Sequence, residues 1–151
     1  MVIISVDLGT TNIKAAAFDR RLAVLGSFSR SVEYQNSGDR VEFSPEDYFD
    51  LVLECIRKCV AAGGANPDET RRLVLTGQAE SLVMLDRDGR PARAAISWLD
   101  MRSSAECEVL SREYPPDVAY EITGQPAIIP TWPITKMLWL RSTSPPWWVR
   151  W

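Results

Sequence analysis

Two apolar runs stand near the start of the chain and are separated by a small polar turn. They cover residues 2–6 and 13–18, and the corner between them reads DLGTTN. Short apolar runs joined by a tight turn are typical of a β-hairpin. A third extended run, residues 22–34, follows a charged turn. The pattern therefore predicts three antiparallel strands.

The next segment changes to the spacing of an amphipathic helix. Ser44 is a suitable N-cap, Pro45 suits the first helical position, acidic residues follow, and glycines stand at positions 63 and 64. Apolar residues then recur three and four positions apart, which marks a buried face. That face is predicted to contain Tyr48, Leu51, Val52, Cys55, Ile56 and Cys59.

Residues 71–78 return to a strand whose apolar centre is Leu73, Val74 and Leu75, and the strand ends in a small polar corner at residues 76–78. A strand that follows a helix and ends in such a corner is where α/β folds usually expose a ligand site. The order of elements predicts an α/β fold with a mixed sheet flanked by helices.

The rest of the chain predicts a second hairpin and three helices. Residues 81–98 form the hairpin, with its turn at Asp88 and Gly89. A helix begins at Ser103 or Ser104 and runs to residue 113, and shorter ones cover the stretches DVAYEITG and ITKMLWLR.

Composition and net charge exclude several classes of function. The 151 residues suffice for one domain, and neither an internal repeat nor a linker divides them. A net charge of -3 gives no general attraction to nucleic acid or to an anionic membrane, so phosphate binding would be local. The chain has no histidine, which excludes histidine bases, histidine metal ligands and Ser-His-Asp catalysis. Without a signal sequence or an apolar span of about 20 residues, a cytoplasmic location is expected.

The three cysteines do not form an even disulfide set. Cys55 and Cys59 lie four residues apart on the predicted helix, and Cys107 is distant. No other ligand types cluster nearby, so reduced thiols packed against the core are expected in preference to a metal or redox site.

The first corner has the chemistry of a phosphate site. Gly9 lets the backbone approach a phosphate, and the hydroxyls of Thr10 and Thr11 can donate hydrogen bonds to it. Lys14 can neutralise the negative charge of a transferred phosphoryl group. Asp7 is expected to bind a hydrated Mg²⁺ through water. The alternative is an ordinary hairpin turn with a solvated lysine.

The stretch VDLGTT resembles the first phosphate loop of the sugar kinase, Hsp70 and actin superfamily, which has an RNase H-like (actin-like ATPase) core. A second stretch, residues 76–103, is similar to the segment that lines the sugar site in FGGY carbohydrate kinases such as xylulokinase and glycerol kinase. Its matching elements are the strand end, the hairpin turn and a W-x-D-x-R pattern. The later TGQP and TKMLWLR also resemble that family.

The resemblance implies site residues and cofactors. ATP phosphates and Mg²⁺ would face Gly9, Thr10, Thr11 and Lys14, with Asp7 bound to the metal through water. The sugar would face Gln78, Ala79, Glu80 and Trp98, where a carboxylate suits neighbouring hydroxyls and an indole suits a carbon chain. A core tryptophan is the alternative for Trp98. Asp100 and Arg102 are expected to pair and fix a loop.

The resemblance leaves the substrate and the catalytic base open. Xylulokinases typically carry Met-His, and glycerol kinases Arg-Glu, where this chain has Ala79 and Glu80. The family's catalytic aspartate lies in a later segment, so none of the residues here is assigned as catalytic, and this chain alone should be weakly active or inactive.

The resemblance covers residues 1–141, an FGGY-type N-terminal domain that is expected to be incomplete. Residues 142–151 form an atypical tail with two prolines and three tryptophans. Exposed tryptophans need a covering surface, and a homodimer is one candidate. Two other functions stay open, an Hsp70-like or actin-like ATPase without a sugar site, and a non-catalytic fragment.

Overall fold

The computed structural model describes residues 1–143, which form two compact units. Unit 1 contains residues 1–33 and 44–79, and unit 2 contains residues 34–43 together with the chain from residue 80 onward. Among the described residues no helix is long and apolar enough to cross a membrane. Each unit has its own sheet and is considered by itself.

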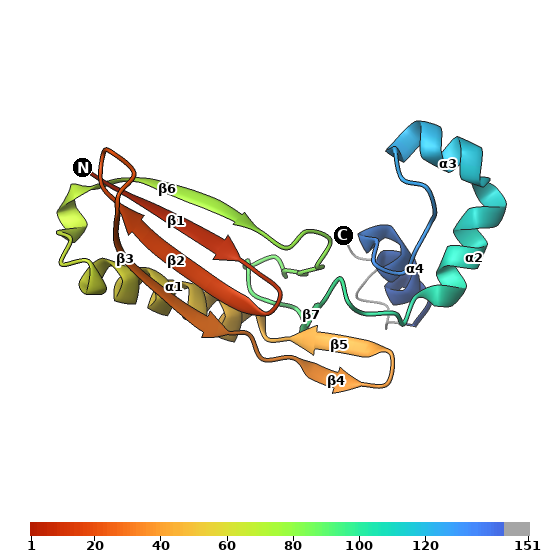
Figure 1. Ribbon diagram of the computed structural model, residues 1–151. Coiled ribbons are helices and arrows are strands. Elements are labelled where there is room, and N and C mark those ends of the chain that lie inside the picture. The colour runs from red at the N-terminus through yellow and green to blue at the C-terminus, as the bar shows by residue number, and fades with distance from the viewer. Residues whose placement is uncertain (144–151) are drawn as a thin grey trace. The chain divides into compact units, whose positions relative to one another are not determined.

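Unit 1 is a four-stranded mixed sheet with one long helix against one face (Figure 1). Its elements are β1 (Val2–Leu8), β2 (Asn12–Phe18), β3 (Val24–Ser31), α1 (Pro45–Ala62), the 3₁₀ turn η1 (Pro67–Glu69) and β6 (Thr70–Gly77). The strand order is β3-β2-β1-β6. β1, β2 and β3 pair antiparallel as predicted, and β6 pairs parallel to β1.

Helix α1 begins as the sequence predicts. The side chain of Ser44 accepts a hydrogen bond from the backbone N–H of Asp47, and Pro45 occupies the first turn. The side chains that α1 buries are those that the helical spacing predicts. Val52, Cys55 and Cys59 are buried in the core, and Tyr48, Leu51 and Ile56 are partly buried and pack against it. The core of unit 1 consists of Val2, Ile4, Val6, Ile13, Ala15, Ala17, Val52, Cys55, Cys59 and Val60.

The thiols are part of the packing. Cys55 and Cys59 belong to this core, Cys107 is buried in unit 2, and all three are free. Burial raises the pKa of each thiol, so each stays protonated and unreactive near neutral pH. Within the described residues no group of acidic, cysteine or histidine side chains could hold a metal. The prediction that the thiols are reduced and packed in or near the core is confirmed.

Strand β6 differs from its prediction in burial. Leu73, Val74 and Leu75 are 53%, 52% and 56% exposed, although the sequence suggests an apolar centre. The reason is geometric, because β6 is an edge strand of the described sheet and α1 packs against β1, β2 and β3. The strand itself is where the sequence predicts it.

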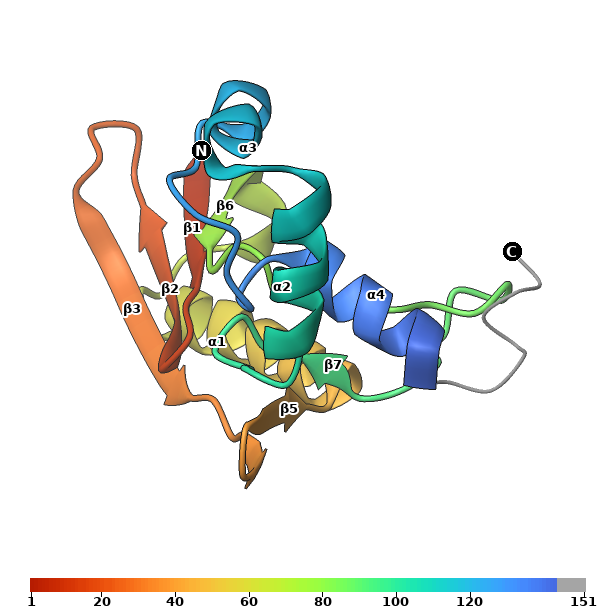
Figure 2. The ribbon, with the colours of Figure 1, turned by 90° about the vertical axis from the view of Figure 1, so that its right-hand side faces the viewer.

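The described residues of unit 2 form a small sheet and three helices. Its elements are β4 (Gln35–Ser37), β5 (Arg40–Phe43), β7 (Ala95–Ile96), α2 (Ser104–Glu113), α3 (Pro116–Thr123) and α4 (Pro133–Thr143). The strand order is β4-β5-β7, and α2 packs beside α4 (Figure 2). All three helices are at the predicted places, whereas the β4–β5 hairpin was not predicted. The third extended run was predicted over residues 22–34, before this hairpin, and β3 covers Val24–Ser31 of it.

The predicted hairpin over residues 81–98 forms only in part. Its tip is a turn in which Gly89 has a φ of 75° and donates its N–H to the carbonyl of Asp86. The two arms form isolated bridges, Leu82 with Ile96 and Leu85 with Pro91, and further backbone hydrogen bonds join Ala92 to Met84 and Asp86 to Arg90, without a continuous ladder. Proline has no N–H to donate to a ladder, which limits regular pairing at that point.

A buried ionic network holds unit 2 together. Asp100 is fully buried and accepts hydrogen bonds from the backbone N–H of Val41 at 2.7 Å and from the guanidinium of Arg102 at 2.7 to 2.9 Å. Glu42 forms ion pairs with Arg93 and, at 2.7 Å, with Arg102. The prediction that Asp100 and Arg102 pair and fix a loop is confirmed.

Trp139 on α4 is bound to the same network. The guanidinium of Arg102 lies 4.9 Å from the centre of the Trp139 ring, and that of Arg40 lies 5.6 Å from it. Cation–π contacts of this kind contribute about 0.5–2 kcal/mol, more when they are shielded from water. The network therefore connects β5, the loop after β7 and helix α4.

The close packing of β3 on α1 depends on a glycine. A Cβ atom on Gly26 would lie 2.4 Å from the backbone N of Gly63 and 2.5 Å from the carbonyl O of Cys59. We therefore expect Gly26→Val to lower the free energy of unfolding by at least about 2 kcal/mol, since backbone atoms cannot make room. Urea denaturation would measure this. The control Ser27→Val, at an exposed neighbour on the same strand, should change stability by about 0.5 kcal/mol or less.

The network of Asp100 predicts acid sensitivity. Burial raises the pKa of this carboxyl, but the hydrogen bonds from Arg102 and Val41 outweigh burial and hold the pKa below its ordinary value of 3.8. A lowered pKa in the folded state stabilises the protein above pH 3.8, and this stabilisation is lost as the pH falls through the folded-state value. Thermal unfolding should therefore show a falling melting temperature below about pH 4.

The variant Asp100→Asn tests the origin of this acid sensitivity. It should lose about 3 kcal/mol at pH 7, because Arg102 is left buried without its main partner, and should respond less to acid. Asp88→Asn, at an exposed turn, should behave like the parent protein. Equal acid responses of the parent and Asp100→Asn would contradict this assignment.

Candidate functional site

The corner between β1 and β2 is a tight turn that requires glycine. Asp7 is paired with Lys14 and Leu8 with Ile13, so residues 9–11 form the connection. A Cβ atom on Gly9 would lie 2.5 Å from the carbonyl O of Asn12, closer than any side chain permits. The sequence uses glycine here because the backbone folds back on itself, which keeps the corner narrow.

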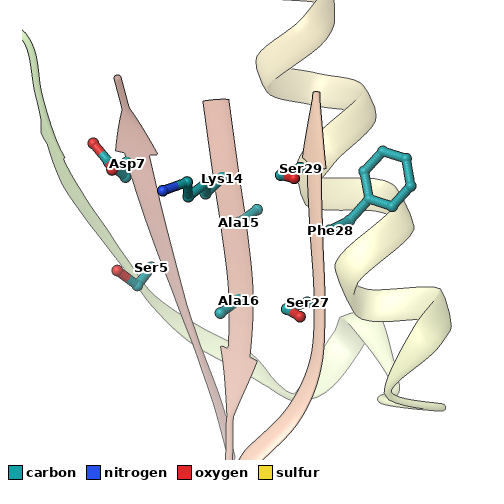
Figure 3. Close-up of a pocket in the computed structure, with 8 residues that line it drawn as sticks. All are labelled: Ser5, Asp7, Lys14, Ala15, Ala16, Ser27, Phe28 and Ser29. Carbon is teal, nitrogen blue, oxygen red and sulfur yellow. The ribbon is translucent and has the colours of Figure 1, made fainter. Parts of the chain in front are cut away.

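Asp7 and Lys14 extend from neighbouring strands over the same face of the sheet (Figure 3). This face is opposite to α1, because strand residues alternate and Val6 and Ala15 point into the core. Ser5, Ser27 and Ser29 lie on the same open face and line a hollow of about 620 Å³ with them. The hollow thus offers one carboxylate, one ammonium and three hydroxyls, a set suited to a polar anionic ligand.

The threonines of the corner sit beside β3. The carbonyl of Thr11 accepts a hydrogen bond of 2.9 Å from the N–H of Val32, and Ser31 donates to the side chain of Asn12 at 3.1 Å. Thr11 is exposed and Thr10 is half-buried. The corner is therefore held by its neighbours while the hydroxyl of Thr11 stays accessible to a ligand.

Gln78 lies next to this corner, although it follows Gly9 by 69 positions in the sequence. Parallel pairing aligns Leu8 with Gly77, and the N–H of Gln78 donates to the carbonyl of Leu8 at 2.9 Å. The side-chain amide of Gln78 lies 3.4 Å from the hydroxyl of Tyr48, which in turn donates to the carbonyl of Gly9 at 3.3 Å. The structure thus brings the predicted phosphate corner and the end of β6 into one polar network.

Tyr48 is the member of this network that sequence reasoning missed. Its position on the apolar face of α1 identified it as a packing residue, and its ring does pack against the core. The available signal was its place in the first turn of the helix, where a buried tyrosine still needs a partner for its hydroxyl.

Of the other predicted sugar residues, Ala79 belongs to unit 1, whereas Glu80 and Trp98 belong to unit 2. Ala79 ends unit 1 and is exposed, and Glu80 is exposed with a φ of 67°. Trp98 is half-buried, and its backbone N–H donates to the hydroxyl of Ser81 at 3.1 Å. The structure therefore places Trp98 beside the residue that follows Glu80.

The donor set is compatible with a hydrated magnesium ion at Asp7. Asp7 is the acidic residue that lines the hollow, so one carboxylate is offered there. Mg²⁺ commonly keeps several waters and binds through one or two carboxylates plus substrate phosphates. The residues present therefore fit an ion held mainly by water and phosphate, and do not fit a closed protein cage.

Comparison with known proteins agrees with this geometry. The model of the FGGY family of carbohydrate kinases, N-terminal domain, matches residues 2–148. A xylulose kinase from Staphylococcus epidermidis is 29% identical over 150 residues, which cover 99% of this chain and 29% of that protein. A glycerol kinase from Thermococcus gammatolerans is 29% identical over 147 residues, covering 95% of this chain and 29% of that protein.

A solved structure shows the same fold. The crystal structure described as a xyloylose kinase from Brucella ovis superposes with a TM-score of 0.89 at 22% identity, covering 99% of this chain and 31% of that one. Its likeness supports the predicted actin-like ATPase fold, with a mixed sheet and flanking helices. The chain spans under a third of the length of these relatives. It belongs to the FGGY family of carbohydrate kinases and corresponds to the N-terminal domain of that family.

Proposed function

We propose that this chain supplies the first phosphate loop and part of the sugar pocket of an ATP-dependent kinase. The reaction moves the γ-phosphoryl group of ATP to a hydroxyl of a ketose or polyol. The observation that carries the proposal is the network of Gly9, Tyr48 and Gln78, which joins the phosphate corner to the strand end that carries the sugar residues.

The phosphate side is assigned to the β1–β2 corner. Gly9 admits a phosphate to the backbone, Thr10 and Thr11 donate hydrogen bonds, and the ammonium of Lys14 offsets negative charge on the phosphates. Asp7 would hold Mg²⁺ through water. The ion would supply positive charge that offsets the charge of the phosphates, while the residues of this chain position the ATP phosphates for transfer.

The sugar side is assigned to Gln78, Ala79, Glu80 and Trp98. The carboxylate of Glu80 can accept hydrogen bonds from two adjacent hydroxyls, and the half-buried face of Trp98 suits the carbon chain of a sugar. Both xylulose and glycerol kinases are among the similar proteins, so the substrate class is a ketose or polyol and the individual compound stays open.

The backbone at Glu80 supports a role for its side chain. A φ of 67° is in the left-handed region, which costs a residue with a Cβ atom roughly 1–2 kcal/mol and costs glycine little. Glu80 is also exposed, so core packing does not explain the choice of residue. Strain of this kind is commonly kept where a side chain is needed for binding.

We also propose the finer assignments that accompany this function. Residues 1–141 form the kinase-like domain and residues 142–151 the tail, of which Ser142 and Thr143 still belong to α4 and 144–151 lie outside the described residues. A cytoplasmic location suits ATP as a substrate and three free thiols. A homodimer would bury exposed apolar surface against a second copy of the chain.

A phosphorylation assay tests the proposed function directly. The chain, and a form extended by any downstream coding sequence, are incubated with ATP, Mg²⁺ and a panel of ketoses and polyols. We expect sugar-dependent turnover in the extended form, reduced at least about 100-fold by Glu80→Gln, because a charge-assisted pair of hydrogen bonds is lost. Sugar-independent ATP hydrolysis would instead identify an ATPase, and silence from both forms would identify a non-catalytic fragment.

The strain at Glu80 gives a second test that needs no activity. We expect Glu80→Gly to be more stable than Glu80→Ala by about 1 kcal/mol, since glycine accepts the left-handed conformation without a Cβ clash. Chemical denaturation of the two variants measures the difference. Both variants should lose binding of glycerol and xylulose equally, because both lack the carboxylate. Retention of binding by either variant would remove Glu80 from the sugar site.

A further inference from the structure

Glu80 and Trp98 lie on two short segments of unit 2 that are joined by a pair of backbone hydrogen bonds. Leu82 donates its N–H to the carbonyl of Ile96 at 2.8 Å, and Ile96 donates its own N–H to the carbonyl of Leu82 at 3.0 Å. An exchanged pair of this kind is the repeating unit of an antiparallel ladder. The two candidate sugar residues each lie two positions beyond this pair.

Both segments leave extended geometry where these residues stand. Glu80 turns the first segment with its φ of 67°. The second segment enters a turn in which the N–H of Asp100 donates to the carbonyl of Ser97 at 3.1 Å. Trp98 is the second residue of that turn. A regular ladder therefore does not hold Glu80 and Trp98 together, and another contact is needed.

The hydroxyl of Ser81 joins the two segments beyond the ladder. It accepts a hydrogen bond of 3.1 Å from the backbone N–H of Trp98. Ser81 is half-buried and directly follows Glu80 in the chain. One hydroxyl therefore connects the backbone next to the candidate sugar carboxylate with the backbone that carries the candidate sugar indole.

The turn that carries Trp98 is held by other bonds within unit 2. Ser97 is fully buried and donates its N–H to the carbonyl of Val41 at 2.9 Å. The hydroxyl of Ser97 accepts from the N–H of Leu99 at 3.2 Å. Because the turn is fixed to β5 in this way, the hydrogen bond from Trp98 restricts where the segment that contains Ser81 can lie.

This contact explains a serine at position 81 better than packing does. A serine side chain buries little apolar surface, and its hydroxyl commonly bonds backbone groups where regular pairing stops. Alanine would leave the N–H of Trp98 without this acceptor at a half-buried place, which carries a desolvation cost. The hydroxyl is therefore best explained by the backbone that it holds.

We infer that Ser81 is a positioning residue of the sugar site, whose hydroxyl sets the place of the Trp98 indole relative to the Glu80 carboxylate. The inference rests on the proposed function, because Glu80 and Trp98 are sugar residues only in that proposal. Ser81 itself does not touch the substrate in this assignment. A ligand whose hydroxyls and carbon chain are bound by two different residues is held well only when both residues keep their relative position.

The first test measures the contact without a ligand, in the 151-residue chain. Ser81→Ala removes the hydroxyl and Ser81→Thr keeps one. The matched control is Ser142→Ala, since the hydroxyl of Ser142 bonds within α4 to the carbonyl of Trp139. After melting temperatures have shown that the variants fold, amide hydrogen exchange at Trp98 is measured. It should be about three- to tenfold faster in Ser81→Ala, as expected for one lost hydrogen bond, and close to the parent rate in the other two.

Ligand binding shows whether the contact matters for the site. Glycerol and xylulose are titrated in turn while the amide resonance of Glu80 is followed by NMR. We expect Ser81→Ala to raise the apparent Kd about three- to tenfold. Ser81→Thr should restore binding to within about twofold of the parent, and Ser142→Ala should bind like the parent.

A double-mutant cycle separates positioning from an independent role of the serine. Trp98→Ala keeps the backbone N–H but removes the indole. If Ser81 acts by placing the indole, then Ser81→Ala should raise the Kd by less than about twofold when Trp98→Ala is already present. Additive losses would show that the hydroxyl acts without the indole, and would overturn the inference.

The outcomes separate the inference from the proposed function. If the parent chain binds glycerol or xylulose and Ser81→Ala binds it equally well, the proposed function stands and the inference fails. Unfolding of Ser81→Ala, or unchanged exchange at Trp98, also overturns the inference. If the parent chain binds neither compound, the proposed function fails for this chain, and the positioning role fails with it whatever the exchange rates are.

Discussion

The parallel pairing of β1 with β6 is the interaction on which the candidate site depends. It aligns the ends of two strands that are far apart in sequence, so that the phosphate corner after Leu8 and the polar end after Gly77 meet at one edge. Parallel strands need a crossover between them, and α1 supplies it while covering one face of the sheet. The capped start of α1 also places Tyr48 where its hydroxyl reaches Gly9. Without this pairing the two motifs would be unrelated pieces of sequence.

The core of unit 1 is apolar, whereas unit 2 buries charged and polar side chains together with apolar ones. Fully buried side chains in unit 2 include Asp100, Ser103, Thr135 and Lys136. Buried polar groups are costly unless their hydrogen bonds are made, and each of these four side chains has partners in the structure. Such a unit gains a defined arrangement of loops, because the directions of hydrogen bonds restrict the backbone more closely than apolar contact does.

Local signals in the sequence determine how much could be predicted. The cap at Ser44 and the apolar spacing of α1 located that helix, and the DLGTTN corner located the hairpin. The β4–β5–β7 sheet was missed because its strands are two to four residues long and Gln35–Ser37 has no apolar alternation. The link through Tyr48 could not be predicted, since it joins residues 9, 48 and 78 across the fold. An apolar run of this kind is compatible with an exposed edge strand and with a buried strand. The exposure of β6 therefore could not be predicted from the sequence.

The edge position of β6 has a consequence for how unit 1 behaves in solution. Within residues 1–143, β6 is paired on one side only and presents three consecutive exposed aliphatic side chains, and a strand of this kind is a template on which other chains can add strands. Arg71 and Arg72 precede this apolar stretch on the same strand, and charges at that position act as gatekeepers against fibre-like association. Two like-charged arginines repel their counterparts when identical strands stack in register. Arg71 and Arg72 therefore oppose the in-register stacking of β6 strands from different copies of the chain.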